Sequence, residues 1–311
     1  MPIDYIKCQL NREVIKHIQH HPLLEFHSRL NERTGELSTT KEAKYKGLTF
    51  TIRINRIWIS GSLHYFFNDD KHNFNDFDCF QLRYVLQELT SLFNIKLEEC
   101  KLENLEVGVN IRLPFKSSLL LNNMLYHEVR KFNDEKVKKG KGGYRVVTHD
   151  RYMLKSYDKA LQFSLPHELW RFEIHYNRMI ELKKFGIIYL SDLRDKSKLL
   201  SLKAELLRRF DEVFIYDWTI NINAIKRPPK DMYKMQLVQY WVEEMDKNNR
   251  LKRKKIYNQI VEDYSDNVKA SIGLMIAQKL DELLEVKRRP FHNRKQETKK
   301  ATISQFSYRM N

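Results

Sequence analysis

Three short segments that follow one another closely limit the fold more than any other feature of the sequence. They are Tyr144–Thr148, Tyr152–Tyr157 and Leu169–Tyr176, and each has aromatic and branched side chains typical of β-strands. Strands that succeed one another without intervening helices favour an antiparallel sheet over alternating β and α units. The sequence therefore predicts antiparallel β-structure near its centre.

Segments in which apolar and polar residues alternate extend this sheet. Residues 48–55 have apolar side chains at every second position and a further strand follows over 57–63, so the two predict a hairpin or a pair of adjacent strands. Residues 105–111 alternate as well, which places Glu106, Gly108 and Asn110 together on one face. We expect this strand to have one polar face that is available for chemistry.

Apolar residues at helical spacing predict helices elsewhere. One is expected over 82–93 behind a cap at Asp76 or Asp78, and after about Leu199 the pattern is mostly helical. We therefore expect an α+β fold with a sheet-based domain over 1–199, a helical DNA-binding region over 200–290 and a basic tail over 291–311. The other predicted helices cover 11–30 with a break near Pro22, 117–132, 201–214, 230–247, 249–264 and 266–285.

The charge of the chain indicates a polyanionic partner. There are 56 Lys and Arg against 40 Asp and Glu, a formal charge of +16, which is typical of proteins that bind a phosphate backbone. A merely basic, well-solvated surface or an attachment to anionic lipid would have the same composition. Basic residues crowd 247–255 and 287–300, and the basic, glycine-containing loop at 136–143 either approaches a phosphate backbone or forms a solvated turn.

Several functional classes find no support in the sequence. The motifs GxxxxGK(S/T), GxGxxG and GxSxG are absent, so nucleotide hydrolysis and serine chemistry are not expected. Cys8, Cys79 and Cys100 are widely spaced and fit a reducing cytoplasm better than a disulfide framework or a zinc site. The N-terminus lacks a signal-peptide pattern and no run approaches ~20 apolar residues, so we expect a cytoplasmic protein without a membrane partner.

Two polar groups on predicted strands are candidate site residues. Glu106 and Asn110 offer oxygen ligands of the kind that Mg²⁺ or Mn²⁺ prefers, although half-exposed strands often alternate in this way. Tyr157 lies between Lys155 and Lys159, which can lower the pKa of a phenol and hold a phosphate. With sixteen tyrosines in the chain, packing is the common role of such a residue. The rival nucleophiles are Tyr144 and Tyr152.

A third group, Arg171, Glu173 and His175, shares one face of a predicted strand. A carboxylate beside a histidine suits a metal ion and an arginine suits a scissile phosphate, whereas a surface ion pair is the plainer alternative. Other histidines are less promising. The pair His17 and His21 lacks a further zinc ligand, and His64, expected on a strand, either faces the side of Glu106 or is a hydrogen-bonded structural residue.

Taken in order, these segments resemble the replication-initiation proteins of filamentous phages and rolling-circle plasmids, mobile genetic elements, together with related nickases of conjugative elements. The resemblance covers roughly residues 1–200, and the order and separations of the motifs match as well as their residues. The matching segments are Gly61–His64 with the loop that contains Asn68 and Phe74, Leu105–Asn110, Tyr157–Lys159 and Arg171–Glu173.

The resemblance implies a sheet-based nicking domain, ferredoxin-like or HUH-like, that acts in DNA replication as an endonuclease and strand transferase. It makes Tyr157 the nucleophile and Glu106 and Glu173 ligands of one divalent metal ion, Mg²⁺ or Mn²⁺. Asp4 can join them, because related chains begin with a similar Ile-Asp strand. The assisting catalytic residues are Lys155, Lys159 and Arg171, and the further metal ligands are Asn110 and His175. Two departures are a missing His-hydrophobe-His pair and the presence of Glu106 and Asn110 at the ends of the central strand, where related chains often have aspartates.

In the expected reaction the hydroxyl of Tyr157 attacks a phosphodiester and leaves a 3′-hydroxyl and a phosphotyrosine. The expected partner is DNA, both as a single-stranded or melted origin and as duplex bound by basic helices. A homodimer and contacts with host replication proteins are compatible with this class. Two alternatives stay open, namely a metal-dependent nuclease in which water attacks, and a nucleic-acid-binding protein without chemistry.

Overall fold

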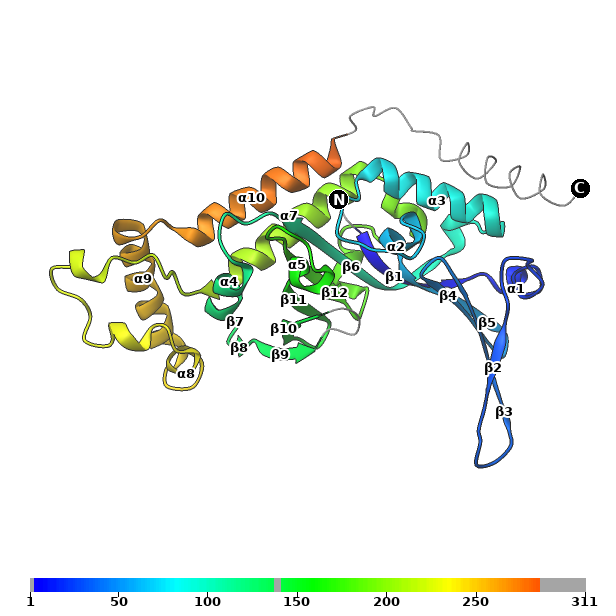
Figure 1. Cartoon of the computed structure of the whole chain (residues 1–311), viewed down its shortest axis with the longest axis horizontal. Coiled ribbons are helices and arrows are strands. Elements are labelled where there is room, and N and C mark those ends of the chain that lie inside the picture. The colour runs from blue at the N-terminus through cyan, green and yellow to red at the C-terminus, as the bar shows by residue number, and fades with distance from the viewer. Residues whose placement is uncertain (1–2, 137–140, 286–311) are drawn as a thin grey trace, which may run out of the picture.

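A ten-stranded antiparallel sheet forms the centre of the α+β fold, in a computed structural model that describes residues 3–136 and 141–285 (Figure 1). The strand order is β2-β3-β4-β5-β1-β6-β12-β11-β10-β9. The middle of the predicted basic loop, 137–140, and the tail after residue 285 lie outside the described residues. The strands are β1 (Ile3–Leu10), β2 (His27–Leu30), β3 (Leu37–Tyr45), β4 (Leu48–Arg53), β5 (Arg56–Ser62), β6 (Lys101–Ile111), β9 (Asn133–Lys136), β10 (Gly143–Thr148), β11 (Tyr152–Asp158) and β12 (Trp170–Tyr176).

The predicted strands are confirmed, and alternation assigns their faces correctly. β10, β11 and β12 pair antiparallel in sequence order, and β4 and β5 form a hairpin. On β6, Leu105, Val107 and Val109 are buried in the main core, while Glu106 and Asn110 lie on the other face. One face of the sheet is thus apolar and faces the helices, and the opposite face is polar on the central strands.

Three long helices cover the apolar side of the sheet: α3 (Cys79–Phe93), α7 (Lys196–Glu212) and α10 (Val268–Leu284). Buried residues of all three belong to the same core as the sheet, and Figure 1 shows the helices along one side of it. Asp78 caps α3 in a capping box with Gln81. Of the two predicted caps, Asp78 is therefore the right one.

A second, smaller core lies beside the first, at the end of the molecule opposite the long β2–β3 hairpin (Figure 1). Its three-stranded sheet consists of β13 (Val213–Ile215), β7 (Met124–His127) and β8 (Arg130–Lys131), and α8 (Val238–Val242) and α9 (Lys247–Tyr264) pack on it. The domain division near residue 199 stays a prediction. In the packing, α8 and α9 belong to the second core, whereas α7 and α10 belong to the core of the large sheet.

Some predicted helices are shorter than expected. The helix over 117–132 is wrong beyond Asn123, because the chain continues as β7, which pairs with β13, and Leu125 and Tyr126 enter the second core. The helix over 230–247 is mostly wrong, since the chain there forms a single 3-10 turn (Met232–Lys234) and the short α8, and Met232 and Met235 reach the same core from this turn. The helix predicted over 11–30 is also shorter, because α1 ends at Gln19 and residues 27–30 form β2. The remaining short helices are α1 (Ile15–Gln19), α2 (Leu63–Phe67), α4 (Ser117–Asn123), α5 (Lys159–Phe163) and α6 (Ile180–Lys183).

The part of the chain that the structure describes contains no helix with both the length and the apolar character required to cross a membrane.

Candidate active site on the polar face of the sheet

Four central strands, β1, β6, β12 and β11, place polar side chains next to one another. The register puts Tyr157 of β11 across from Arg171 of β12, and Lys155 across from Glu173. On the other side of β12, His175 lies across from Glu106. Residues that the sequence assigned to three separate polar strand faces are therefore neighbours in the folded chain.

Three buried carboxylates, Asp4, Glu106 and Glu173, meet on this face. One oxygen from each lies within 4.8 Å of the others, and the residues are 2–7% exposed. Asp4 joins from β1, where the pairing with β6 shifts register between Ile3 and Ile6. A bulge of this kind re-aims a side chain. It explains why Asp4 lies on the polar face although Ile6, two residues further on, is in the core.

Two cations are embedded among the carboxylates. The fully buried guanidinium of Arg171 donates to Asp4 at 2.8 Å and also to Glu173. The Nζ of Lys155 lies 2.7 Å from Glu106 and 3.3 Å from Glu173. Burial alone would raise the pKa of Glu173, but the charges of Arg171 and Lys155 lower it to about 2. Glu173 is therefore ionised throughout the ordinary pH range.

The hydroxyl of Tyr157 lies at the edge of the carboxylate cluster. It donates to Oε2 of Glu173 at 3.3 Å, and the residue is 8% exposed. Burial, together with the negative charge of Glu173, raises the pKa of Tyr157 well above its usual value. The two lysines nearby do not lower this pKa as the sequence suggested. Tyr157 is therefore a phenol in this arrangement and needs a proton acceptor in order to attack.

Lys159, the first residue of α5, is buried beside Tyr157. Its Nζ lies 3.5 Å from the hydroxyl of Tyr157 and donates to the amide oxygen of Asn73 at 2.7 Å. Burial and the charge of Arg171 lower the pKa of Lys159 to about 7. Near neutral pH a substantial fraction of Lys159 is thus uncharged, and its lone pair is free to accept a proton.

The nucleophile candidate and the carboxylates line a cavity of about 470 Å³. Tyr5, Tyr65 and Tyr144 contribute aromatic side chains to its wall, and nucleic-acid bases stack well on such rings. Phe66, by contrast, is almost fully buried and offers no surface to a base. The complete lining is Asp4, Tyr5, Ser62, Tyr65, Asn73, Glu106, Tyr144, Lys155, Tyr157, Lys159, Gln162, Glu173 and His175.

Three further residues complete the site, and none of them was assigned a role in it from the sequence. Asn73 joins two parts of it, because its Nδ2 donates to Asp4 at 2.8 Å while its oxygen holds Lys159. Ser62 donates to the other oxygen of Asp4. Gly108 lies across from Glu173, and a Cβ at this position would come within 2.6 Å of the Cβ of Glu173. Only the loop containing Phe74, part of the resemblance, marked the region of Asn73.

Other predicted residues have different surroundings. Asn110 accepts from Arg171 at 3.0 Å and donates to the carbonyl of Phe74 at 3.1 Å, so both ends of its amide are already used. The Nδ1 of His175 lies 3.1 Å from Glu106. The placement of His64 on a strand is wrong. It lies in α2, where it stacks on Phe77 and its Nε2 lies 2.7 Å from the amide oxygen of Asn75.

The rival tyrosines also differ from Tyr157 in their partners. The hydroxyl of Tyr144 donates to Glu135 at 2.5 Å, although its side chain lines the cavity. Tyr152 bonds to Arg209 and Glu128 in a separate polar cluster. Of the three tyrosines, Tyr157 is the one whose hydroxyl contacts the clustered carboxylates.

The donor set fits a hard divalent cation. Carboxylate oxygens are the ligands that Mg²⁺ and Mn²⁺ prefer, and Asp4, Glu106 and Glu173 present one each within 4.8 Å of the others. The ammonium of Lys155 competes for the same oxygens at 2.7 and 3.3 Å. A bound cation would therefore have to compete with Lys155 for Glu106 and Glu173, and with Arg171 for Asp4 and Glu173.

Comparisons with known proteins give a structural similarity and no match in sequence. No protein-family model matches the chain, and no curated protein is significantly similar to it in sequence. Among solved structures, the chain is similar to the "Rolling Circle Replication Initiator Protein from Geobacillus stearothermophilus", with 13% sequence identity and a TM-score of 0.41. The alignment covers 76% of this chain and 96% of that chain.

Proposed function

We propose that the chain is a rolling-circle replication initiator that nicks and rejoins one DNA strand through Tyr157. The observation that carries this proposal is the position of the Tyr157 hydroxyl, 3.3 Å from Glu173 in a cavity lined by Asp4 and Glu106. A nucleophile, a set of hard anionic ligands and buried cations in one cavity support phosphoryl transfer. The order of the sequence motifs supports the same reaction.

Asp4, Glu106 and Glu173 would hold the divalent metal ion, with His175 beside Glu106. When bound, such an ion supplies positive charge to the non-bridging phosphate oxygens. Arg171 has a positioning role, because Asp4, Asn110 and Glu173 occupy its guanidinium and leave no exposed surface for a phosphate. This differs from the direct phosphate contact expected from the sequence.

The chemical step transfers a phosphoryl group of the DNA strand from O3′ to the oxygen of Tyr157. The oxygen of Tyr157 forms a bond to phosphorus, the bond from phosphorus to O3′ breaks, and O3′ takes up a proton as it leaves. The product keeps a phosphodiester to tyrosine, so a free 3′-hydroxyl can reverse the reaction without ATP. Lys155 lines the cavity and provides positive charge close to the phosphate, while Nζ of Lys159 lies 3.5 Å from the hydroxyl of Tyr157.

The test uses the full chain, a pool of end-labelled single-stranded oligonucleotides and supercoiled plasmid, with Mn²⁺. We expect cleavage and a protein–DNA adduct that survives denaturing electrophoresis. Tyr157→Phe should abolish both, since it removes one hydroxyl and no charge. Tyr144→Phe is the matched control, because it removes a hydroxyl from the same cavity. An adduct that persists in Tyr157→Phe would show that another residue is the nucleophile.

One observation favours a second candidate, a hydrolytic metal-dependent nuclease on the same face. The pKa of Tyr157 is raised by burial, and a protonated phenol is a poor nucleophile. In such an enzyme water attacks and Tyr157 only packs. Cleavage without an adduct, retained in Tyr157→Phe, would establish this alternative. Binding of DNA without any cleavage would instead show a DNA-binding protein without chemistry.

A further inference from the structure

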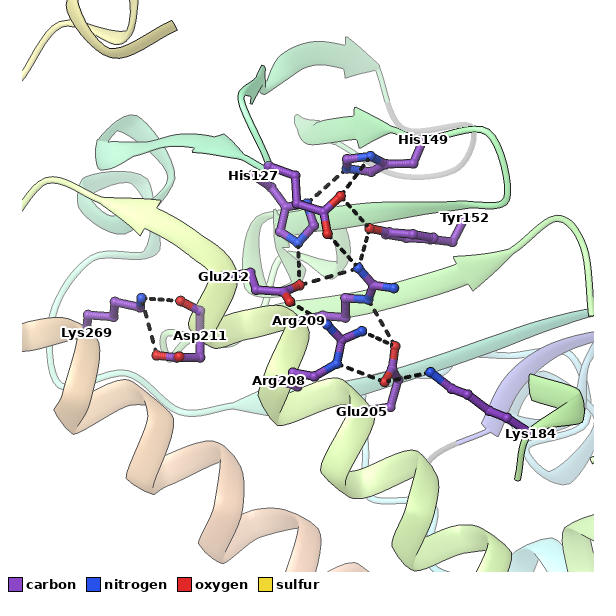
Figure 2. Close-up of polar contacts among 11 residues, drawn as sticks. His127, His149, Tyr152, Lys184, Glu205, Arg208, Arg209, Asp211, Glu212 and Lys269 are labelled. Atoms are coloured by element: carbon purple, nitrogen blue, oxygen red, sulfur yellow. Dashed lines mark hydrogen bonds and ion pairs between the residues drawn. The ribbon is translucent and has the colours of Figure 1, made fainter. Parts of the chain in front are cut away.

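Two buried histidines face each other in a polar cluster outside the candidate active site. His127 ends β7 and His149 lies between β10 and β11, and they are 0% and 8% exposed. The Nδ1 of His127 lies 2.9 Å from Nε2 of His149, and their ring planes meet at 80°. Figure 2 shows the two rings together near Tyr152, with Glu212 of α7 on the far side of His127.

The outer nitrogen of each ring faces a carboxylate. The Nε2 of His127 lies 3.2 Å from Glu212, and Nδ1 of His149 lies 3.6 Å from Glu128. A carboxylate only accepts hydrogen bonds, so Glu212 favours the tautomer of His127 with the proton on Nε2. The Nδ1 of His127 then presents a lone pair toward Nε2 of His149 at 2.9 Å. Either a ring N–H of His149 or a cation shared by the two nitrogens satisfies this lone pair.

We propose that His127, His149 and Glu128 bind one divalent transition-metal ion of the zinc class. One ligand atom from each residue lies within 4.8 Å of the others. Nitrogens bound to a tetrahedral ion at ~2.0–2.1 Å are roughly 3.3 Å apart, so a small separation of the rings accommodates the ion.

Neighbouring residues hold the proposed ligands in place. Glu212 orients His127 in the carboxylate–histidine arrangement that commonly supports a metal ligand. Arg209 of α7 donates to Oε1 of Glu128 at 3.0 Å and to Glu212 at 3.3 Å. The other oxygen of Glu128 faces His149. Glu128 is about half exposed, so water can complete the coordination of an ion there.

The chemistry of the ligands separates this site from the candidate active site. Imidazole nitrogens suit Zn²⁺ and its neighbours in the transition series, whereas an all-carboxylate set suits Mg²⁺ or Mn²⁺. The ion would also lie between the two cores. His127 follows Tyr126 of the second core, while β10 and β11 belong to the large sheet. The site therefore has a structural role, as a clip between the small sheet and the large one.

The test measures zinc binding by the full chain after treatment with a chelator. A competition titration against a chromophoric chelator should show tight uptake of one Zn²⁺, and Co²⁺ should give the visible absorption of a four- or five-coordinate site. His149→Gln should lose this uptake. His17→Gln, which changes an exposed histidine, is the matched control and should keep it. No uptake by the wild type, or equal uptake by the two variants, would overturn the proposal.

Nuclear magnetic resonance of the imidazole nitrogens keeps the test decisive if His149→Gln does not fold. Addition of Zn²⁺ to the wild type should shift Nδ1 of His127 and Nε2 of His149 and raise the melting temperature. A proton shared by the two rings and unaffected by Zn²⁺ would contradict the proposal. Glu106→Gln should keep the zinc site, so failure here is distinguishable from failure of the proposed nicking function.

Discussion

In the proposed reaction, Tyr157 must lose its proton before its oxygen can attack phosphorus, and two groups nearby can accept this proton. Glu173, with a pKa lowered to about 2, is a very weak base for a phenol whose own pKa is raised. Lys159, with a pKa lowered to about 7 by burial, is far better matched in its neutral form. The geometry allows a proton to pass from Tyr157 to Lys159, because the hydroxyl oxygen of Tyr157 and Nζ of Lys159 are 3.5 Å apart. Lys159 is thus the expected general base.

The rate of strand cleavage should therefore rise with pH up to about 7 and level off above it, because Lys159 accepts a proton only once it is neutral. Lys159→Met should slow cleavage by orders of magnitude and remove this rise. Single-turnover rates between pH 5.5 and 8.5, a range of roughly three units around that pKa, check the expectation. Lys16→Met, at an exposed site, is the control. An unchanged pH profile in Lys159→Met would assign the proton to another acceptor.

Most of the residues of the site could be predicted from the sequence, but not all their roles. Strand alternation placed Glu106, Arg171 and Glu173 on polar faces, and the register then brings those faces together. Asp4 could not be placed by alternation, because a register shift in β1 reverses its side. Asn73 lies in a polar loop that has no periodic pattern at all. Neither burial nor the competition between charges can be read from spacing, so the raised pKa of Tyr157 was not foreseen.

At the scale of elements, β6 and β12 approach so closely at Gly108 that a side chain there has no room. A Cβ would lie 2.6 Å from the Cβ of Glu173 and 3.2 Å from the guanidinium of Arg171. Both neighbours are buried and bonded to each other, so neither can move cheaply. The conformation of Gly108 is ordinary. Its role is to leave space for the polar cluster.

Gly108→Ala should therefore destabilise the chain by about 1–3 kcal/mol, as overpacking in a core does, and should also reduce Mn²⁺ binding. Urea unfolding and calorimetric titration measure the two effects. Gly273→Ala in α10 is the matched control, because its Cβ meets Phe210 only at an ordinary 3.8 Å. That change should be neutral or stabilise the helix by up to ~1 kcal/mol. Equal stability of the two variants would contradict the packing argument.

The helices over 117–132 and 230–247 were predicted wrongly, and both segments have residues in the second core. Residues 117–132 have apolar side chains at helical spacing, yet Leu125 and Tyr126 form a short strand because β13 offers them a partner. A pairing between segments almost ninety residues apart is not visible in a local pattern. The long helices α3, α9 and α10 were predicted well. α3 and α10 have buried residues along most of their length, whereas α9 buries only Tyr257 and Ile260 in its C-terminal half.

At the scale of the whole molecule, the position of exposed positive charge indicates which of the two cores binds duplex DNA in the proposed function. α9 has several exposed basic residues, among them Lys247, Lys252 and Lys255, and belongs to the second core. The proposed active site instead pairs its cations with carboxylates. α7 packs on the large sheet, so a fragment that ends near residue 200 would lose part of its core. The role of α9 is better tested in the full chain.

We expect α9 to bind duplex DNA through its phosphates, separately from the cleavage of a single strand. In the variant with Lys247, Lys252 and Lys255 changed to Gln, the slope of log K against log salt should become shallower by up to ~2.7, at ~0.9 per phosphate contact. Cleavage of a single-stranded oligonucleotide should be unchanged. The control changes Lys16, Lys101 and Lys183, three exposed lysines outside the second core, and so removes the same charge. If α9 is only a solvated surface, both variants will have the same salt slope. A shallower salt slope in the α9 variant than in the control variant would assign duplex binding to the second core.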